Sequence, residues 1–261
     1  MQICTLASSS SGNCCLVSNG DTHVLIDAGI SMRRITKSLA DLGLCPRDLA
    51  GILVTHEHSD HISGIKMMVK YHSVPIMVSK GVGSELCKIV PETQQHLKVF
   101  EVGKCFQLGS IEVNSFYTPH DTPESVGYRL CGDNKTISFA TDIGCVTREI
   151  FDMVSGSDVA VIEANHDVQM LKNGAYPVFL KRRILSDHGH LSNDDSGTLA
   201  VRIAEAGTRK IILAHLSREN NTPRIAYDTV SCAFKEAGAV VGGDVELSVA
   251  PASEMGNTYT A

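Results

Sequence analysis

Residues 55–61, with the sequence THEHSDH, concentrate three histidines and two acidic residues in seven positions. Imidazole and carboxylate groups are common ligands for zinc, manganese and iron in proteins. His56 and His58 are two residues apart, so in extended backbone their side chains project to the same side and can bind one ion together. Asp60 and His61 follow at the start of a predicted helix, where they can face a second position. The pattern therefore predicts a metal site.

Other side chains with metal-binding or acid–base chemistry lie at, or just beyond, the ends of apolar strand-like segments. In layered α/β folds sites form at such ends, because the sheet holds the backbone while loop side chains converge. His166, within the segment EANHD, is predicted to line this pocket and bind substrate. The residues at the strand ends are Asp27, His56, His120, Asp142, His166 and His215.

The elements that must position these residues alternate between strands and helices, which predicts an α/β class of fold. Helices are predicted over residues 31–43, 59–72 and 222–238, where apolar residues recur at helical spacing. No low-complexity tract or flexible linker marks a boundary, so one domain over residues 1–261 is predicted. Strands are predicted at residues 2–8, 14–19, 22–29, 50–55, 110–120, 157–166 and 209–217, and as a pair around a turn within 127–142.

Composition and charge exclude several classes of protein. The chain has 261 residues, of which 43% are hydrophobic, enough to bury a substantial core. No stretch reaches the roughly 18 apolar residues that a bilayer span requires, and no secretory signal pattern is present. Nine scattered cysteines without a CxxC pair indicate a cytoplasmic protein in a reducing compartment. The net charge of −6 argues against binding nucleic acid by bulk charge, but it leaves a local basic stripe open.

Five segments resemble the ordered motifs of the metallo-β-lactamase superfamily: LIDAG, THEHSDH, TPHD, FATDIG and ILAHLS. The resemblance implies a four-layer αββα sandwich with a dinuclear metal site at one edge of its two sheets. It implies that Asp142 bridges the two ions and that Asp27 orients the histidine loop, a support that metal-binding imidazoles usually have. The residues implied as ligands are His56, His58 and His120 for the first ion, and Asp60, His61 and His215 for the second.

This ligand set predicts a hydrolase. Neutral imidazoles and carboxylates suit zinc, and a site with oxygen ligands also accepts manganese or iron. Two ions about 3.5–4 Å apart lower the pKa of a shared water toward 7 and stabilise the attacking and leaving oxygens of a displacement. We therefore expect two divalent metal ions as cofactors, zinc first, with manganese or iron as alternatives. His58 supports hydrolysis further, because relatives with a redox di-iron centre have Glu in that place.

The segment SDHGHLSNDDSG, residues 186–197, bears on the substrate. In nuclease branches of the superfamily, a histidine in a similar Gly-His segment contacts the scissile phosphate. His190 is the candidate for that role, and His188 is a second candidate for substrate binding. A helix is expected to follow, capped by Asn193, Asp194 or Asp195. The residues predicted to take part in catalysis are Asp27, Asp60 and His190.

Four longer segments closely resemble the YycJ/WalJ (VicX) group of the superfamily: SSSSGNC, EANHD, YPVFLKRRILSDHGHLSN and LAHLSRENNTP. That group is associated with bacterial cytoplasmic DNA exonuclease activity of 5′-to-3′ polarity and with mismatch repair, so the resemblance implies DNA as the substrate. A local basic rim is compatible with DNA, because each neutralised phosphate strengthens binding. The residues of this rim are Lys181, Arg182, Arg183, Arg218 and Arg224.

Alternatives remain open at this point. The same metal site can serve a small ester, thioester or lactone, which the net acidity and modest length favour slightly. A metal-stabilised regulatory protein without catalysis is a hypothesis of another class. An RNA substrate is weakened by the absence of an RNA-binding signature. Residues 8–13, SSSSGN, fit either a turn that holds a phosphate or a plain loop.

Overall fold

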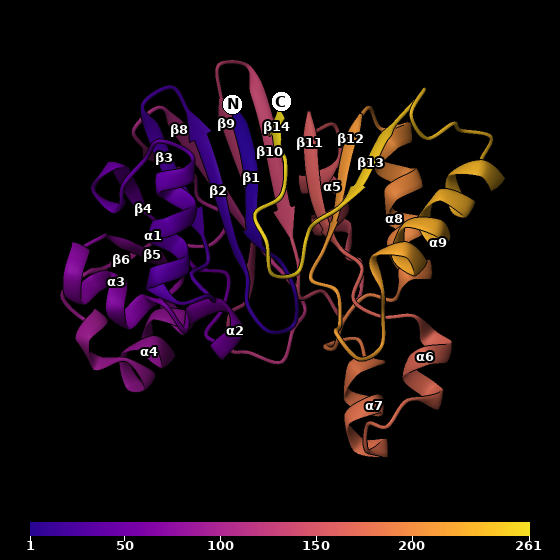
Figure 1. Ribbon diagram of the computed structural model, residues 1–261, viewed down its shortest axis with the longest axis horizontal. Coiled ribbons are helices and arrows are strands. Elements are labelled where there is room, and N and C mark those ends of the chain that lie inside the picture. Colours follow the sequence, from indigo (N-terminus) through magenta and orange to yellow (C-terminus); the bar gives the residue numbers. More distant parts are fainter.

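The computed structural model describes residues 1–261 and contains two seven-stranded sheets that pack face to face (Figure 1). The first sheet consists, in spatial order, of β14 (Thr258–Thr260), β1 (Gln2–Ala7), β2 (Cys14–Asn19), β3 (Thr22–Ile26), β4 (Leu49–Leu53), β5 (Ile76–Val78) and β6 (Leu97–Val99). The second consists of β13 (Glu246–Val249), β12 (Lys210–Ala214), β11 (Val159–Glu163), β10 (Lys135–Ala140), β9 (Val126–Gly132), β8 (Ile111–Tyr117) and β7 (Phe106–Leu108).

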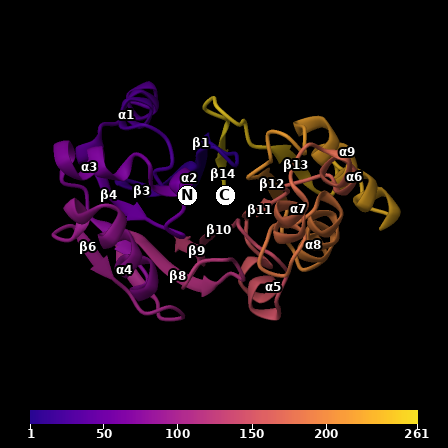
Figure 2. The same cartoon turned by 90° about the horizontal axis from the view of Figure 1, so that it is seen from below.

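Helices on the outer faces of both sheets complete four layers (Figure 2). Two short 3₁₀ helices, Pro46–Asp48 and Pro91–Thr93, lie in the first half of the chain. The predicted four-layer αββα sandwich of the α/β class is therefore confirmed. The helices beside the first sheet are α1 (Met32–Asp41), α2 (Ser59–Ile62), α3 (Ile65–His72) and α4 (Lys80–Ile89), and those beside the second are α5 (Arg148–Val154), α8 (Asn193–Glu205) and α9 (Pro223–Glu236).

Three buried apolar clusters fill the spaces between the layers. β3 explains how one strand serves two of them, because successive side chains of a strand point to opposite faces. Leu25 packs with the helices beside the first sheet, while Val24 and Ile26 pack between the two sheets. A strand covered on both faces has to be apolar throughout, which is why the central strands are continuous hydrophobic runs.

The single helix predicted for residues 59–72 is wrong, because the chain forms α2 and α3 with a break at Ser63 and Gly64. Gly64 N donates to the carbonyl oxygen of Ala28 (2.8 Å), so this backbone lies against the loop that follows β3. A Cβ at position 64 would come within 2.2 Å of the Ile30 carbonyl oxygen. The apolar spacing continues through the break, and only tertiary contact reveals it.

A pair of short helices was not predicted. α6 (Val168–Asn173) and α7 (Val178–Ile184) connect β11 to α8 and project beyond the body of the sandwich at the edge where α2 lies (Figure 1). The cap expected for α8 at Asn193, Asp194 or Asp195 is also wrong. Ser192 is the N-cap, and its hydroxyl accepts from the backbone N–H of Asp195 (3.1 Å).

The two ends of the chain lie side by side, because β1 and β14 pair as antiparallel strands at the edge of the first sheet (Figure 1). None of the helices combines the length and the apolar character needed to cross a bilayer. The assignment of residues 1–261 to one domain stays a prediction.

Candidate metal centre

The loops that follow six strands meet at one edge of the sandwich. β3 and β4 are parallel neighbours in the first sheet, and β10, β11 and β12 are parallel neighbours in the second. Parallel strands present their carboxyl ends at a common edge, where α/β proteins bind ligands. The residues just beyond these strands and β8 are Asp27, His56, His120, Asp142, His166 and His215.

Three of these residues have left-handed backbone conformations. The φ angles are 60° at Asp27, 57° at Asp142 and 58° at His215. A residue other than glycine pays a conformational free energy of about 1–2 kcal/mol in this left-handed region. Such residues therefore usually lie in turns or at functional sites. Each of the three lies within two residues of the end of a strand, where the chain turns.

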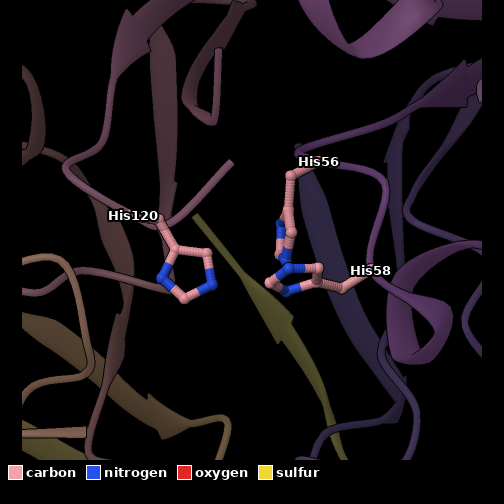
Figure 3. Close-up of side chains that lie close together, drawn as sticks. All are labelled: His56, His58 and His120. Atoms are coloured by element: carbon pink, nitrogen blue, oxygen red, sulfur yellow. The ribbon is translucent and has the colours of Figure 1, made fainter. Parts of the chain in front are cut away.

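The first group of candidate ligands consists of His56, His58 and His120, whose rings point toward one another from two sides of the site (Figure 3). The His56 ring centroid lies 4.6 Å from that of His58 and 5.0 Å from that of His120. Burial lowers the pKa of all three imidazoles and so favours the neutral form. Neutral imidazole is the form that binds a metal ion.

The hydrogen bonds of these rings also fit a metal site. His56 Nδ1 lies 3.0 Å from the Thr55 hydroxyl, and His120 Nδ1 lies 3.1 Å from the carbonyl oxygen of Gly189. The Nε2 atoms of His56 and His120 are buried and have no hydrogen-bond partner in the protein. A protein partner on one ring nitrogen commonly fixes a histidine whose other nitrogen binds metal.

The second group consists of Asp60, His61 and His215. Asp60 Oδ2 lies 3.4 Å from His61 Nε2 and 3.3 Å from His215 Nε2. Asp142 connects this group to the first. Its carboxylate lies 3.4 Å from His61 Nε2 and 3.7 Å from His120 Nε2, and its Oδ2 atom is buried without a hydrogen-bond partner. The geometry therefore places one carboxylate between two sets of imidazoles.

The carboxylates and imidazoles of the second group shift one another's pKa. Burial alone would raise the pKa of Asp60, but hydrogen bonds from His215 and His61 outweigh it and hold the pKa well below its ordinary value. Burial alone would lower the pKa of His215, but the neighbouring carboxylates, Asp142 first, raise it to about 10. A bound cation would take the place of the imidazole protons, because histidine binds a metal ion in its neutral form.

Asp27 is fully buried and fixes the histidine loop from behind. Its Oδ2 accepts from His61 Nδ1 (2.7 Å) and from the Thr55 hydroxyl (2.9 Å), and its Oδ1 accepts from the Thr55 backbone N–H (2.8 Å). Burial raises the pKa of Asp27, which these bonds partly offset. With Nδ1 held in this way, His61 directs Nε2 toward Asp60 and Asp142.

Thr55→Val is expected to lower the free energy of unfolding by about 1–2 kcal/mol, because it removes a buried hydrogen bond to a carboxylate while keeping the side-chain shape. Urea unfolding of the metal-free protein measures the change. Thr198→Val is the matched control, since its exposed hydroxyl bonds only to its own helix at Asp194, and it should stay within about 0.5 kcal/mol of wild type. An equal loss in both variants would contradict the role of Thr55.

Glu163, the last residue of β11, was missed by the sequence interpretation. Its Oε1 accepts from His190 Nδ1 (2.7 Å) and His215 Nδ1 (2.9 Å). Its Oε2 accepts from the backbone N–H groups of Ile143 (2.8 Å) and Leu191 (3.1 Å). Burial alone would raise the pKa of Glu163, but the charges and hydrogen bonds of His190 and His215 outweigh it and lower that pKa. One feature of the sequence could have indicated Glu163: it is the single carboxylate in the otherwise apolar strand VAVIE and stands at its end.

His190 lies beside the cluster, with its ring centroid 5.0 Å from that of His120 and 5.4 Å from that of His215. Its side chain is 18% exposed, so it borders both the cluster and solvent. Because Glu163 occupies Nδ1, Nε2 is the ring atom that remains for a ligand. The role of His190 toward a phosphate stays a prediction that this position supports.

Two further groups of side chains also lie close enough to hold an ion: His56, His61 and Asp142, and Asp142, Glu163, His190 and His215. The other two predicted substrate-binding histidines belong to none of these four groups. His188 is exposed, and its backbone packs against Gly144. His166 is buried, with no hydrogen-bond partner on either ring nitrogen, and burial lowers its pKa to about 4. Substrate binding by His166 and His188 stays a prediction.

The SSSSGN segment packs against the cluster. Asn13 is buried, and its Nδ2 donates to the carbonyl oxygen of Ser9 (3.0 Å) and lies 3.4 Å from Asp60 Oδ2. The Ser8 hydroxyl accepts from the backbone N–H of His215 (2.8 Å). This loop therefore supports residues of the second group. The seven residues predicted as ligands all converge here, and their assignment to metal stays a prediction: His56, His58, Asp60, His61, His120, Asp142 and His215.

Comparison with known proteins identifies the family. The family model described as "Beta-lactamase superfamily domain" matches residues 22–216. "Exodeoxyribonuclease WalJ" of Streptococcus pneumoniae serotype 2 is 38% identical over 247 residues, which cover 93% of this chain and 91% of that protein. "Exodeoxyribonuclease YycJ" of Bacillus anthracis is 36% identical over 243 residues, which cover 93% and 92%.

Solved structures agree on the fold. Zn²⁺-bound PqqB from Methylobacterium extorquens superposes with a TM-score of 0.74 over 100% of both chains at 16% sequence identity, a level that bears on the fold alone. The resemblance predicted from the five motifs and the four longer segments is thus confirmed. This chain belongs to the beta-lactamase superfamily and, within it, to the family of WalJ and YycJ.

Proposed function

We propose that this protein is a metal-dependent exodeoxyribonuclease that releases nucleotides from DNA ends in the 5′-to-3′ direction. The observation that carries the proposal is the identity of 36–38% along 93% of the chain to two relatives named exodeoxyribonucleases. The cluster supports it, because its imidazoles and carboxylates suit hydrolysis of a phosphodiester. A role in DNA repair stays a prediction.

Two divalent metal ions are the proposed cofactors, with zinc first and manganese or iron as alternatives. The unpartnered Nε2 atoms of His56 and His120 and the unpartnered Oδ2 of Asp142 support this fit. When bound, such ions supply a water nucleophile near neutral pH and neutralise charge on the phosphate. The proposed ligands are His56, His58 and His120 for one ion, Asp60, His61 and His215 for the other, and Asp142 for both.

The side chains around the cluster have separate proposed tasks. Asp27 holds His61 in one orientation through Nδ1. Glu163 does the same for His215 and His190. In its doubly protonated form, with the Nδ1 proton held by Glu163, His190 would donate its Nε2 proton to a phosphate oxygen and pass that proton to the leaving oxygen. Positioning of these groups before DNA binds reduces the reorganisation that the reaction requires.

Removal of metal tests the proposal. Chelator-treated protein is expected to release no nucleotides from end-labelled linear duplex DNA, and addition of zinc, manganese or iron should restore release. Closed circular DNA of the same sequence is the control substrate, because it has no end. Absence of nucleotide release with all three metals at several salt concentrations would contradict the proposal. Hydrolysis of chromogenic carboxyl esters with inert phosphodiesters would contradict it as well.

A further inference from the structure

α7 exposes an unusual combination of side chains next to the metal centre. Phe179 is 74% exposed and Val178 is 64% exposed, and Phe179 is the only phenylalanine among the exposed large hydrophobic residues. Exposed apolar groups of this size commonly mark a binding surface. Figure 1 places α7 below both sheets, on the side of the molecule where α2 lies.

Basic residues share the exposed face of α7 with the phenyl ring. Arg182 and Arg183 follow Phe179 by three and four residues, so each arginine neighbours the phenyl ring on the helix surface. Ile184, by contrast, is buried. We call Phe179, Arg182 and Arg183 the α7 stripe.

Several contacts hold the stripe in place beside the cluster. Arg183 forms an ion pair with Asp121, whose carboxylate also lies 3.3 Å from His120 Nε2. Lys181 Nζ ties α7 to the end of α6 by donating to the carbonyl oxygens of Lys172 (2.8 Å) and Gly174 (2.7 Å). The stripe thus begins at the edge of the cluster with Arg183 and extends along α7 by one turn, about 6 Å, to Phe179.

The charge of the stripe complements a polyanion. The protein as a whole carries a net charge of −6, so its surface in general repels nucleic acid. Arg182 is exposed and takes part in no ion pair, and Arg183 has Asp121 as its one acidic partner. Two guanidinium groups beside an exposed aromatic ring form the combination that binds phosphates and stacks on bases.

We infer that the α7 stripe binds the end of the DNA strand, an inference that rests on the proposed function. Phe179 stacks on the face of the terminal base, while Arg182 and Arg183 contact the adjacent phosphates. Bases inside a duplex have both faces covered by their neighbours, and only an end presents a free face. Stacking on Phe179 therefore favours DNA ends and brings the terminal phosphodiester toward the cluster.

Substitution of the phenyl ring tests the inference. Phe179→Ala is expected to raise the KM for linear duplex DNA roughly tenfold, in the range of a lost base–aromatic stack. The ratio of kcat/KM for DNA to kcat/KM for bis-p-nitrophenyl phosphate should fall by about the same factor. Phe179→Trp, which keeps an aromatic ring at this position, should have the wild-type ratio. Tyr71→Ala is the matched control, because Tyr71 is 57% exposed beside a lysine on α3 and should leave the ratio at the wild-type value.

Salt dependence tests the arginines. Arg182→Gln is expected to reduce the slope of log affinity for DNA against log salt concentration by about 0.9, the value for one lost phosphate contact. Arg148→Gln is the control, since Arg148 is also exposed, on α5, and pairs with Asp152. Its slope should equal that of wild type.

The possible outcomes separate the two proposals. A wild-type protein that releases no nucleotide overturns the proposed function and the inference together. An active wild type whose ratio is unchanged by Phe179→Ala overturns only the inference. A change of oligomeric state in Phe179→Ala, seen by analytical ultracentrifugation, also overturns it, because the exposed ring would then belong to an interface between copies of this chain.

Discussion

Asp142→Asn is expected to reduce the kcat for DNA by a factor on the order of 10²–10³ or more, the size of effect seen when one charge-stabilising group leaves an active site. Asp142 belongs to two of the groups that can hold an ion, one with His56 and His61 and one with His190 and His215. Asparagine keeps the shape of the side chain but removes its charge and one of its oxygens. Both proposed metal positions would therefore lose a ligand at once.

Metal content provides the second measurement for Asp142→Asn. Wild-type protein reconstituted with zinc should hold two ions per chain by elemental analysis, and the variant should hold one or fewer. Asp152→Asn is the matched control, because that carboxylate lies exposed on α5, and both its metal content and its kcat should equal those of wild type. Two ions per chain in Asp142→Asn, with a kcat within tenfold of wild type, would show that Asp142 does not bridge them.

The local part of the site could be predicted from the sequence because adjacent residues share one loop. His56, His58, Asp60 and His61 lie within one strand–loop–helix segment. Their spacing alone therefore indicates that they bind metal at one site. Asp142 cannot be found in this way. Its position just beyond an apolar strand marked it as a candidate, and only the resemblance to the superfamily implied that it bridges two ions.

Residues that act through tertiary contacts could not be predicted. Glu163 and Asp121 are ordinary carboxylates in the sequence, and their importance comes from partners far along the chain, such as His215 for Glu163 and Arg183 for Asp121. The break at Gly64 has the same origin, because close approach of the loop after β3 decides it. Periodicity describes which faces are buried, but it does not describe what buries them.

The α7 stripe shows a further limit of pattern reasoning. The basic residues of α7 were noticed in the sequence, but helical spacing does not tell which face of a seven-residue helix is exposed. Phenylalanine is hydrophobic and usually lies in the core, and only the fold shows that the ring of Phe179 lies in solvent. An exposed aromatic residue is informative for this reason, since it departs from the placement that its hydrophobicity favours.

Glu163→Gln is expected to lower the free energy of unfolding by about 3–5 kcal/mol, the cost of breaking a buried charged pair by removing one partner. The four groups that surround Glu163 are all hydrogen-bond donors: two imidazole Nδ1 atoms and the backbone N–H groups of Ile143 and Leu191. A carboxylate accepts from all four. A glutamine has one oxygen and one NH₂ group, so in either orientation its NH₂ group faces two donors.

A control variant separates the loss of the buried hydrogen bonds of Glu163 from the mere loss of one negative charge. Glu149→Gln is the control, because Glu149 lies exposed in the first turn of α5, and its loss should cost at most about 1 kcal/mol. Urea unfolding at neutral pH gives both free energies. In folded Glu163→Gln we also expect kcat for DNA to fall about 10–100-fold, as when the partner of a metal-binding histidine is changed. A variant of wild-type stability would mean that Glu163 does not accept from both histidines, because four converging donors leave no place for an amide.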